Sequence, residues 1–261
     1  MRADYHIHTW HSDDCECPMS DMVDQALRLG LDEIVFTEHA DYGVPGVEVC
    51  DFPKYFEELK RMREIYGDRI TIRAGAEFGV QTHTLPIYHQ VFAEYDFDFV
   101  ILSTHERDNQ QYHLHEYQKG KTPDEYHRGY YEHIYDCICG FDHYSVLGHL
   151  DVIKRYEQPF EYPDDKILDI VEKILRKVIA DGKGIEVNTS SFKYKMKDLT
   201  PSRRILQLYH DLGGKIITIG SDSHVPQYLE SHFDEVKEEL KKIGFTHYCT
   251  FEKMKPIFWE L

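Results

Sequence analysis

The chain has 261 residues, a length that fits one α/β barrel domain, and 41% of them are hydrophobic, which is enough for a globular core. Its formal charge of −17 argues against a nucleic-acid partner, because binding to a phosphate backbone depends on clustered lysines and arginines. The 17 histidines are many for this length and, together with the acidic balance, favour a site for divalent cations.

The six cysteines do not by themselves predict disulfides. The chain begins with MRADYHIH rather than with an apolar signal segment, and no apolar run approaches the length of a transmembrane helix. The C-x-C pairs Cys15/Cys17 and Cys137/Cys139 differ from the C-x-x-C of zinc ribbons and redox helices. We therefore expect reduced thiols, a cytoplasmic location and no membrane partner.

Seven short apolar runs predict β-strands, and segments with helix signals separate them. The strands are expected at residues 4–8, 32–37, 70–77, 98–103, 144–149, 183–188 and 215–221. Helices are expected at 20–30, 53–67, 124–139, 164–181 and 233–244, and from Thr200 as N-cap and Pro201 as first residue to Gly213. This alternation predicts a parallel sheet within a single domain that spans residues 1–261. Residues 105–122 read as a long polar loop or lid.

Six of the predicted strands run into side chains that bind metal ions. One such residue alone is weak support, but the carboxyl ends of parallel barrel strands meet at one face, where active sites lie. Pairs spaced i, i+2 share one face of a strand and can chelate one ion. The donors suit zinc, iron or manganese, and their number suggests up to three ions. These residues are His6, His8, His39, Glu77, His105, His149, Asp222 and His224.

Six motifs in a fixed order point to a known family. DYHIHT, TEHAD, GAEFG, STHE, VLGHLDVIKRY and GSDSHVP occur in this order between residues 4 and 226. Together they resemble the PHP superfamily, named for polymerase and histidinol phosphatase, and within it the histidinol-phosphate phosphatases. The resemblance implies an α/β fold, a distorted (β/α)7 TIM-like barrel, which agrees with the independent count of seven strands.

The resemblance also implies how two of the ions would be held. The first ion would be bound by an H-x-H pair and an aspartate, and the second by two further histidines, with one glutamate bridging the two. In this chain the matching residues are His6, His8 and Asp222 for the first ion, His105 and His149 for the second, and Glu77 as the bridge.

A third ion would be held by His39 and His224 on the same resemblance. Its remaining ligand is expected six residues after the second histidine of H-x-H, where this chain has Asp14 and some relatives have histidine. Asp13 and His11 lie close by in the sequence and stay open as alternatives.

The expected activity is the metal-dependent hydrolysis of L-histidinol phosphate to L-histidinol and phosphate, a step of histidine biosynthesis. A metal-bridging hydroxide would attack in line, since the chain shows neither a P-loop nor a C-x5-R nucleophile loop. A phosphoesterase for another small phosphate ester or nucleotide is the alternative, followed by a non-catalytic metal-binding module. An exonuclease of the same superfamily should have a basic groove, which the charge of −17 opposes.

Contacts with the small phosphomonoester are less well specified by the sequence. The resemblance favours an arginine after the fifth strand as the phosphate clamp. A second arginine, after the fourth strand, and two polar residues after the sixth strand are further candidates because of their positions in the sequence. A ligand side chain would protonate the leaving group. Acids that bind the amine of histidinol are sought in the loop 105–122, but the sequence does not identify them. The candidates are Arg155 for the clamp, Arg107, Asn188 and Ser190 for further contacts, and Asp222 or His224 for the proton.

Overall fold

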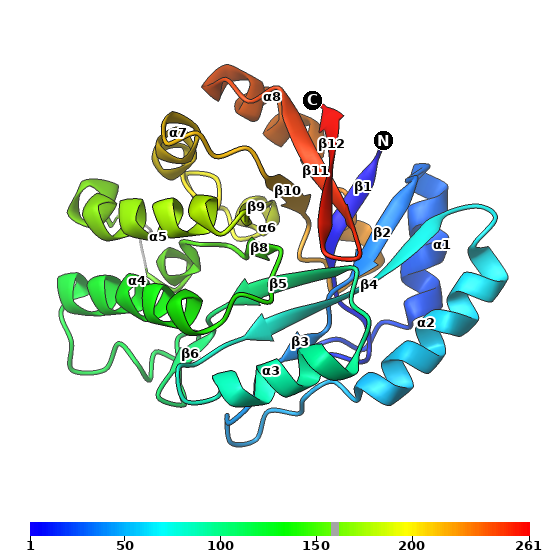
Figure 1. Ribbon diagram of the computed structural model, residues 1–261, viewed down its shortest axis with the longest axis horizontal. Coiled ribbons are helices and arrows are strands. Elements are labelled where there is room, and N and C mark those ends of the chain that lie inside the picture. Colours follow the sequence, from blue (N-terminus) through cyan, green and yellow to red (C-terminus); the bar gives the residue numbers. More distant parts are fainter. Residues whose placement is uncertain (158–161) are drawn as a thin grey trace.

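Seven parallel strands form one sheet that curls into a barrel in the computed structural model, which describes residues 1–157 and 162–261 (Figure 1). Around the barrel they are β1 (Ala3–Ile7), β2 (Glu33–Phe36), β4 (Thr71–Gly79), β5 (Phe99–Ser103), β8 (Val146–Leu147), β9 (Gly184–Asn188) and β10 (Ile217–Gly220). The short strand β3 (His39–Ala40) pairs with the end of β4. All seven expected strands are present, and the expected distorted TIM-like barrel is confirmed.

The barrel closes where β1 meets the segment that follows β10. The backbone amide of Asp222 donates to the carbonyl of His6 at 2.8 Å, and the amide of His8 donates to the carbonyl of Ser223 at 2.9 Å. Ile7 and Ser223 form a parallel bridge. Closure of the barrel therefore brings the pair His6 and His8 next to the pair Asp222 and His224.

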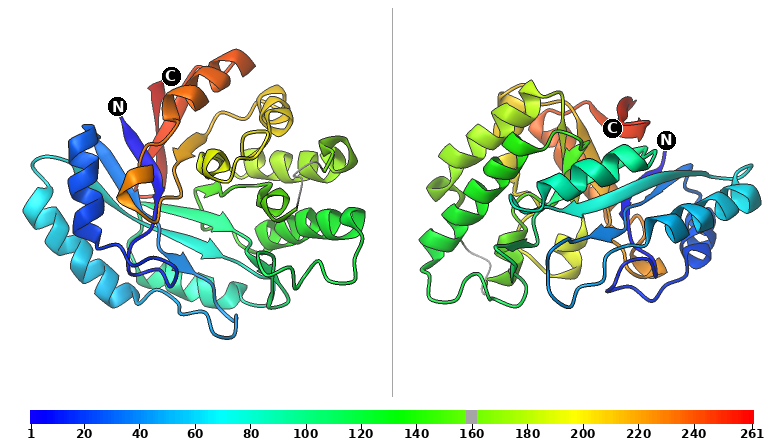
Figure 2. Two further views of the ribbon diagram at one scale, coloured as in Figure 1. Left: turned by 180° about the vertical axis from the view of Figure 1, so that it is seen from behind. Right: turned by 60° about the horizontal axis from the view of Figure 1, so that its bottom comes forward.

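Helices cover the outside of the barrel (Figures 1 and 2). Six of them match expected helices, although α5 begins four residues later than expected because residues 164–166 form a 3-10 turn. Neither α3 nor α6 was expected. The helices are α1 (Met19–Leu29), α2 (Phe52–Tyr66), α3 (Leu85–Glu94), α4 (Pro123–Gly140), α5 (Leu168–Ala180), α6 (Ser190–Lys193), α7 (Arg203–Asp211) and α8 (Phe233–Ile243). None of the described helices is both long and apolar enough to cross a membrane.

Helix α7 begins later than the sequence predicts. Its N-cap is Ser202, whose hydroxyl accepts the backbone amide of Ile205 at 3.3 Å. The predicted cap Thr200 is instead bound to the end of β9, because its carbonyl accepts the backbone amide of Asn188 at 2.7 Å. The predicted N-cap at Thr200 and first helical residue at Pro201 are therefore wrong.

A C-terminal hairpin, β11 (His247–Glu252) and β12 (Lys255–Glu260), was not expected and closes the amino-terminal end of the barrel. Its Phe251 lies 5.1 Å from Phe99 between ring centroids, and Phe99 lies 4.9 Å from Tyr5. The Phe251 amide also donates to the Tyr5 hydroxyl at 2.6 Å. This end of the barrel is therefore filled by apolar side chains. The two chain ends lie close together beside it (Figure 2).

The segment 105–122 carries a small antiparallel hairpin rather than an unstructured loop. Its strands are β6 (Glu106–Arg107) and β7 (Gln110–Gln111). Asp108 and Asn109 make the turn with φ angles of 55° and 60°, a left-handed conformation that these two residue types tolerate. Because β6 follows β5 directly, the hairpin lies at the carboxyl end of the barrel.

Two histidines of α4 are buried and give the fold a pH dependence. Burial, followed by the charge of Arg107, lowers the pKa of His133 to about 4, and burial lowers that of His127 to about 4 as well. In an unfolded chain a histidine has a pKa of about 6.5. As the pH falls below about 6.5 the unfolded state takes up protons first, so the free energy of unfolding decreases down to about pH 4.

We expect His133→Gln, which cannot take up this proton, to lose less stability than the wild type when the pH is lowered from about 7 to about 5. Urea unfolding of both proteins with chelator present would measure this, since metal release then does not contribute. An equal loss in the two proteins would contradict the account of His133.

Candidate metal centre

The carboxylate of Glu77, near the end of β4, is the hub of the site. Glu77 is fully buried. Burial alone would raise the pKa of Glu77, but the nearby histidines, His6 foremost, hold it well below its usual range. Five imidazoles approach it: His6 Nε2 at 3.1 Å, His39 Nδ1 at 3.0 Å and His8 Nε2 at 3.5 Å from Oε2, and His149 Nε2 at 2.8 Å and His105 Nε2 at 3.3 Å from Oε1.

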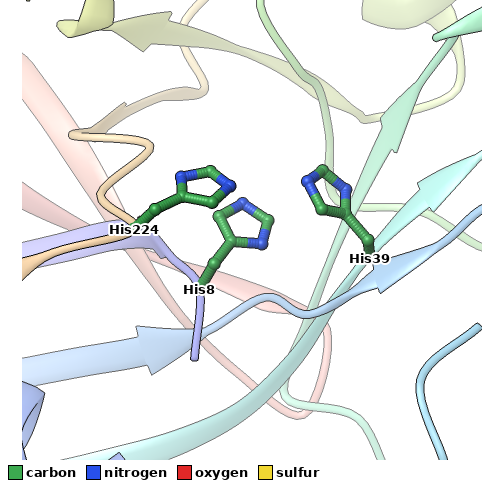
Figure 3. Close-up of side chains that lie close together, drawn as sticks. All are labelled: His8, His39 and His224. Carbon is green, nitrogen blue, oxygen red and sulfur yellow. The ribbon is translucent and has the colours of Figure 1, made fainter. Parts of the chain in front are cut away.

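The strand ends bring donor atoms into small groups around this hub. Figure 3 shows the rings of His8, His39 and His224 facing one another, although they come from three different segments of the chain. The centroid of His8 lies 4.2 Å from that of His39 and 4.3 Å from that of His224. Donor atoms within 4.8 Å of one another belong to four sets among the described residues: His8, His39 and His224; His6, His8 and Asp222; His39, Glu77 and His105; and Asp41, His105 and Glu106.

The donors have the properties that a divalent ion requires. His8 Nε2, His39 Nδ1 and His224 Nε2 are buried and make no hydrogen bond within the described chain. Burial, followed by the charges of His39 and His224, holds the pKa of His8 well below its usual range, which favours the neutral ring that binds metal. Neutral imidazoles and carboxylates in such sets suit zinc, iron or manganese. The residues present therefore fit the expected metal ions.

Asp14 is the best placed of the three alternatives for the third ion. Its Oδ2 lies 3.0 Å from His224 Nε2, and its Oδ1 lies 3.7 Å from His39 Nε2. His11 turns away, with its Nε2 2.8 Å from a carboxylate oxygen of Glu58. Asp13 also lines the cavity, but its carboxylate forms no ion pair with a histidine among the described residues, whereas that of Asp14 pairs with two. The geometry thus favours the aspartate six residues after His8.

A second layer of acids, which the sequence did not reveal, lies behind the histidines. His6 Nδ1 is 2.6 Å from Glu186 Oε1, and His105 Nδ1 is 2.9 Å from Asp41 Oδ1. His8 Nδ1 is 3.1 Å from Ser12 Oγ, which donates in turn to Glu38 Oε2 at 2.7 Å. Such partners fix the tautomer of a histidine and leave its other nitrogen for the metal. The sequence did offer one signal for two of these acids: each lies two residues before or after a residue at a predicted strand end, as Glu186 does in GIEVN and Asp41 in TEHAD.

Arg155 reaches the same cavity, which has a volume of about 550 Å³. Its Nη2 donates to Ser190 Oγ at 2.5 Å and lies 3.6 Å from Asp222 Oδ2, and its guanidinium lies 4.4 Å from the ring centroid of Tyr194. Its Nε is buried and makes no hydrogen bond within the described residues. Arg155 therefore has an N–H group available for a ligand, held in a fixed orientation by its other contacts.

Three predicted substrate contacts are placed differently from the expectation. The Nη1 of Arg107 donates to the carbonyl of Gly129 at 2.7 Å, which directs it towards α4. Asn188 and Ser190 are buried behind Arg155 and Asp222, and the Asn188 amide donates to Asp222 Oδ2 at 3.3 Å. None of the three is among the described residues that line the cavity. Their direct contact with substrate stays a prediction, and Asn188 and Ser190 hold residues that do line the cavity.

Replacing Glu186 by glutamine tests the outer acids. Glu186→Gln keeps the shape but removes the negative charge behind His6, so we expect metal affinity to fall about 10- to 100-fold. Competition with a chelator measures this. Glu33→Gln is the matched control, because Glu33 is a buried carboxylate that binds Tyr5 and Arg73 at the other end of the barrel. Equal weakening in both variants would contradict a specific role for Glu186.

Comparison with known proteins agrees with this geometry. The PHP domain model matches residues 4–190. The chain is 32% identical over 260 residues to the histidinol-phosphatase of Lactococcus lactis, covering 97% of this chain and 96% of the relative.

Comparison with solved structures agrees with the comparison of sequences. The crystal structure of the Lactococcus lactis histidinol phosphate phosphatase, complexed with zinc, L-histidinol and phosphate, superposes with a TM-score of 0.91, at 32% identity over 98% of both chains. A crystal structure from Listeria monocytogenes, at 19% identity, shares the fold with a TM-score of 0.75 over 90% of this chain and 99% of that one. The chain therefore belongs to the PHP domain family and, within it, to the histidinol-phosphatases.

Proposed function

We propose that this chain is a metal-dependent phosphomonoesterase that hydrolyses L-histidinol phosphate to L-histidinol and phosphate in histidine biosynthesis. The observation that carries the proposal is the convergence of five imidazoles on Glu77 beside a buried arginine with an available N–H group. The Lactococcus lactis relative, whose crystal structure holds zinc, L-histidinol and phosphate, supports the choice of substrate.

We assign the strand-end donors to three ions. His6, His8 and Asp222 would hold the first, His105 and His149 the second, and Asp14, His39 and His224 the third, with Glu77 shared between the first two. Bound there, divalent ions lower the pKa of water towards neutrality and offset the negative charge of the phosphoryl oxygens.

The protein's own part begins with Arg155. A phosphate monoester carries negative charge that repels nucleophiles, and a planar guanidinium binds phosphoryl oxygens in a defined direction. The hydrogen bond to Ser190 and the contact with Tyr194 fix the guanidinium and leave its Nε without a hydrogen bond among the described residues. Arg155 would therefore orient the phosphoryl group for in-line attack.

The leaving alkoxide also needs a proton, and two side chains that line the cavity can supply it. The Oδ2 of Asp222 is held by Arg155 and Asn188, whereas His224 Nε2 lies 3.0 Å from Asp14 Oδ2. We propose that Asp222 or His224, which approach the cavity from one loop after β10, takes the proton released by the attacking water and passes it to the leaving oxygen.

Three wider features complete the proposal. Residues 1–261 would form one domain, since the C-terminal hairpin packs against the strands of the barrel. The enzyme would work in the cytoplasm, which is consistent with six free cysteines. Its partner would be the small phosphomonoester and not a nucleic acid, in keeping with the charge of −17.

Phosphate release from a panel of substrates tests the proposed activity. Protein purified without chelator, and then with single metals restored, would be assayed with L-histidinol phosphate beside nucleotide and sugar monoesters. We expect kcat/KM for L-histidinol phosphate to exceed the others by orders of magnitude and chelation to abolish the activity. Equal kcat/KM values across the panel would contradict L-histidinol phosphate as the substrate and favour another small ester. No phosphate release from any compound would favour a non-catalytic metal-binding module.

A pair of arginine variants tests the phosphate clamp. We expect Arg155→Ala to lower kcat/KM by about 100-fold, because it removes a charge-assisted contact with the phosphoryl group. Arg107→Ala removes a guanidinium that is bound to Gly129 instead, and we expect it to retain the wild-type kcat/KM. A similar loss in both folded variants would contradict the assignment.

A further inference from the structure

The metal ligands and Arg155 account for the phosphate of the proposed substrate but not for its ammonium group. L-Histidinol phosphate carries this group on the carbon next to the CH2 that bears the ester oxygen. An ammonium ion that enters a partly buried cavity needs an anionic partner to offset its loss of water. The geometry points to Glu106 as the carboxylate that binds the substrate's ammonium group, an inference that rests on the proposed function.

Glu106 lies in the wall of the cavity while being almost completely buried. It is 2% exposed, begins β6 directly after His105, and lines the cavity together with Gln111, its partner on β7. The turn of the β6–β7 hairpin is bound to the segment that follows β4, because the amide of Asn109 donates to Gln81 Oε1 at 2.7 Å. The hairpin thus presents a carboxylate to the cavity from a fixed backbone.

The carboxyl group of Glu106 has no strong hydrogen-bond or cationic partner within the described chain. Its nearest hydrogen-bond donor is the side-chain amide of Gln81, at 3.5 Å, and no described lysine or arginine forms an ion pair with it. Buried carboxylates are normally paired, because the loss of hydration costs several kcal/mol. A cationic ligand would complete this environment.

The other carboxylates that line the cavity already have partners or are open to solvent. Glu77, Asp222 and Asp14 each lie among imidazoles. Asp41 Oδ1 is 2.9 Å from His105 Nδ1, and Asp13 is exposed. Glu106 is the carboxylate that remains for the ammonium group.

The position of Glu106 also fits the short spacing of the substrate. Donor atoms of Glu106, Asp41 and His105 lie within 4.8 Å of one another, so Glu106 borders the proposed ligands of the second ion. Arg155 approaches from the side of β9 and β10 through Ser190 and Asp222. A phosphoryl group between Arg155 and the imidazoles would leave its neighbouring ammonium on the β5 side, where Glu106 lies.

The test compares two substrates that differ in this one group: L-histidinol phosphate and 3-(imidazol-4-yl)propyl phosphate, which has hydrogen in place of the ammonium. The measured quantity is the ratio of their kcat/KM values. We expect the wild type to prefer L-histidinol phosphate and Glu106→Gln to lower that ratio about 10- to 100-fold, the size of one charge-assisted contact. An unchanged ratio, or an equal loss on both substrates, would overturn the role of Glu106.

A second variant and a binding measurement keep the test decisive. Glu106→Asp retains the charge on a shorter side chain, and we expect it to keep a preference between wild type and Glu106→Gln. Calorimetry with L-histidinol and its deamino analogue, on proteins of equal metal content, should show the same order without any reaction. A wild type that does not distinguish the substrates would refute the proposed substrate itself, whereas a preference that persists in Glu106→Gln would refute only the inference.

Discussion

The site depends on the contact between Glu77 and the five imidazoles that converge on it from β1 and the segments that follow β1, β2, β5 and β8. A buried carboxylate without partners would cost several kcal/mol, and so would a buried cluster of charged histidines. The carboxylate offsets the positive charge of the histidines, and the histidines offset the negative charge of the carboxylate. Bound metal ions would complete this arrangement of charges. The barrel makes this possible because its strand ends deliver side chains from distant parts of the sequence to one point.

The amino end of the barrel contributes to stability, whereas the carboxyl end carries the candidate metal site. At the amino end, Tyr5, Phe99 and Phe251 pack beneath the C-terminal hairpin, so the interior there resembles an ordinary core. At the carboxyl end the interior is polar, and acids such as Glu186 and Asp41 hold the histidines from behind. Glycines make room for this second layer, since a Cβ at Gly220 would lie 2.4 Å from Glu186 Oε1.

The parts of this arrangement that repeat along the chain could be predicted, and the parts that depend on unique contacts could not. Seven strands follow from hydrophobic runs, and the predicted ligands follow from the six of these runs that lead into His, Asp or Glu. The direction of Arg107 depends on the carbonyl of Gly129, which no local pattern encodes. The start of α7 depends on the contact of Thr200 with β9. Glu186 was missed because its one signal in the sequence, the i, i+2 spacing from the strand end at Asn188, does not say which histidine the carboxylate faces.

The most direct test of the account is the position of the metal ions. Crystals of the protein grown with zinc, measured at wavelengths on either side of the zinc absorption edge, would locate each ion by its anomalous scattering. The account predicts zinc within about 2.0–2.3 Å of Glu77 and of the histidines that surround it. Zinc bound elsewhere on the chain, with none beside Glu77, would contradict it.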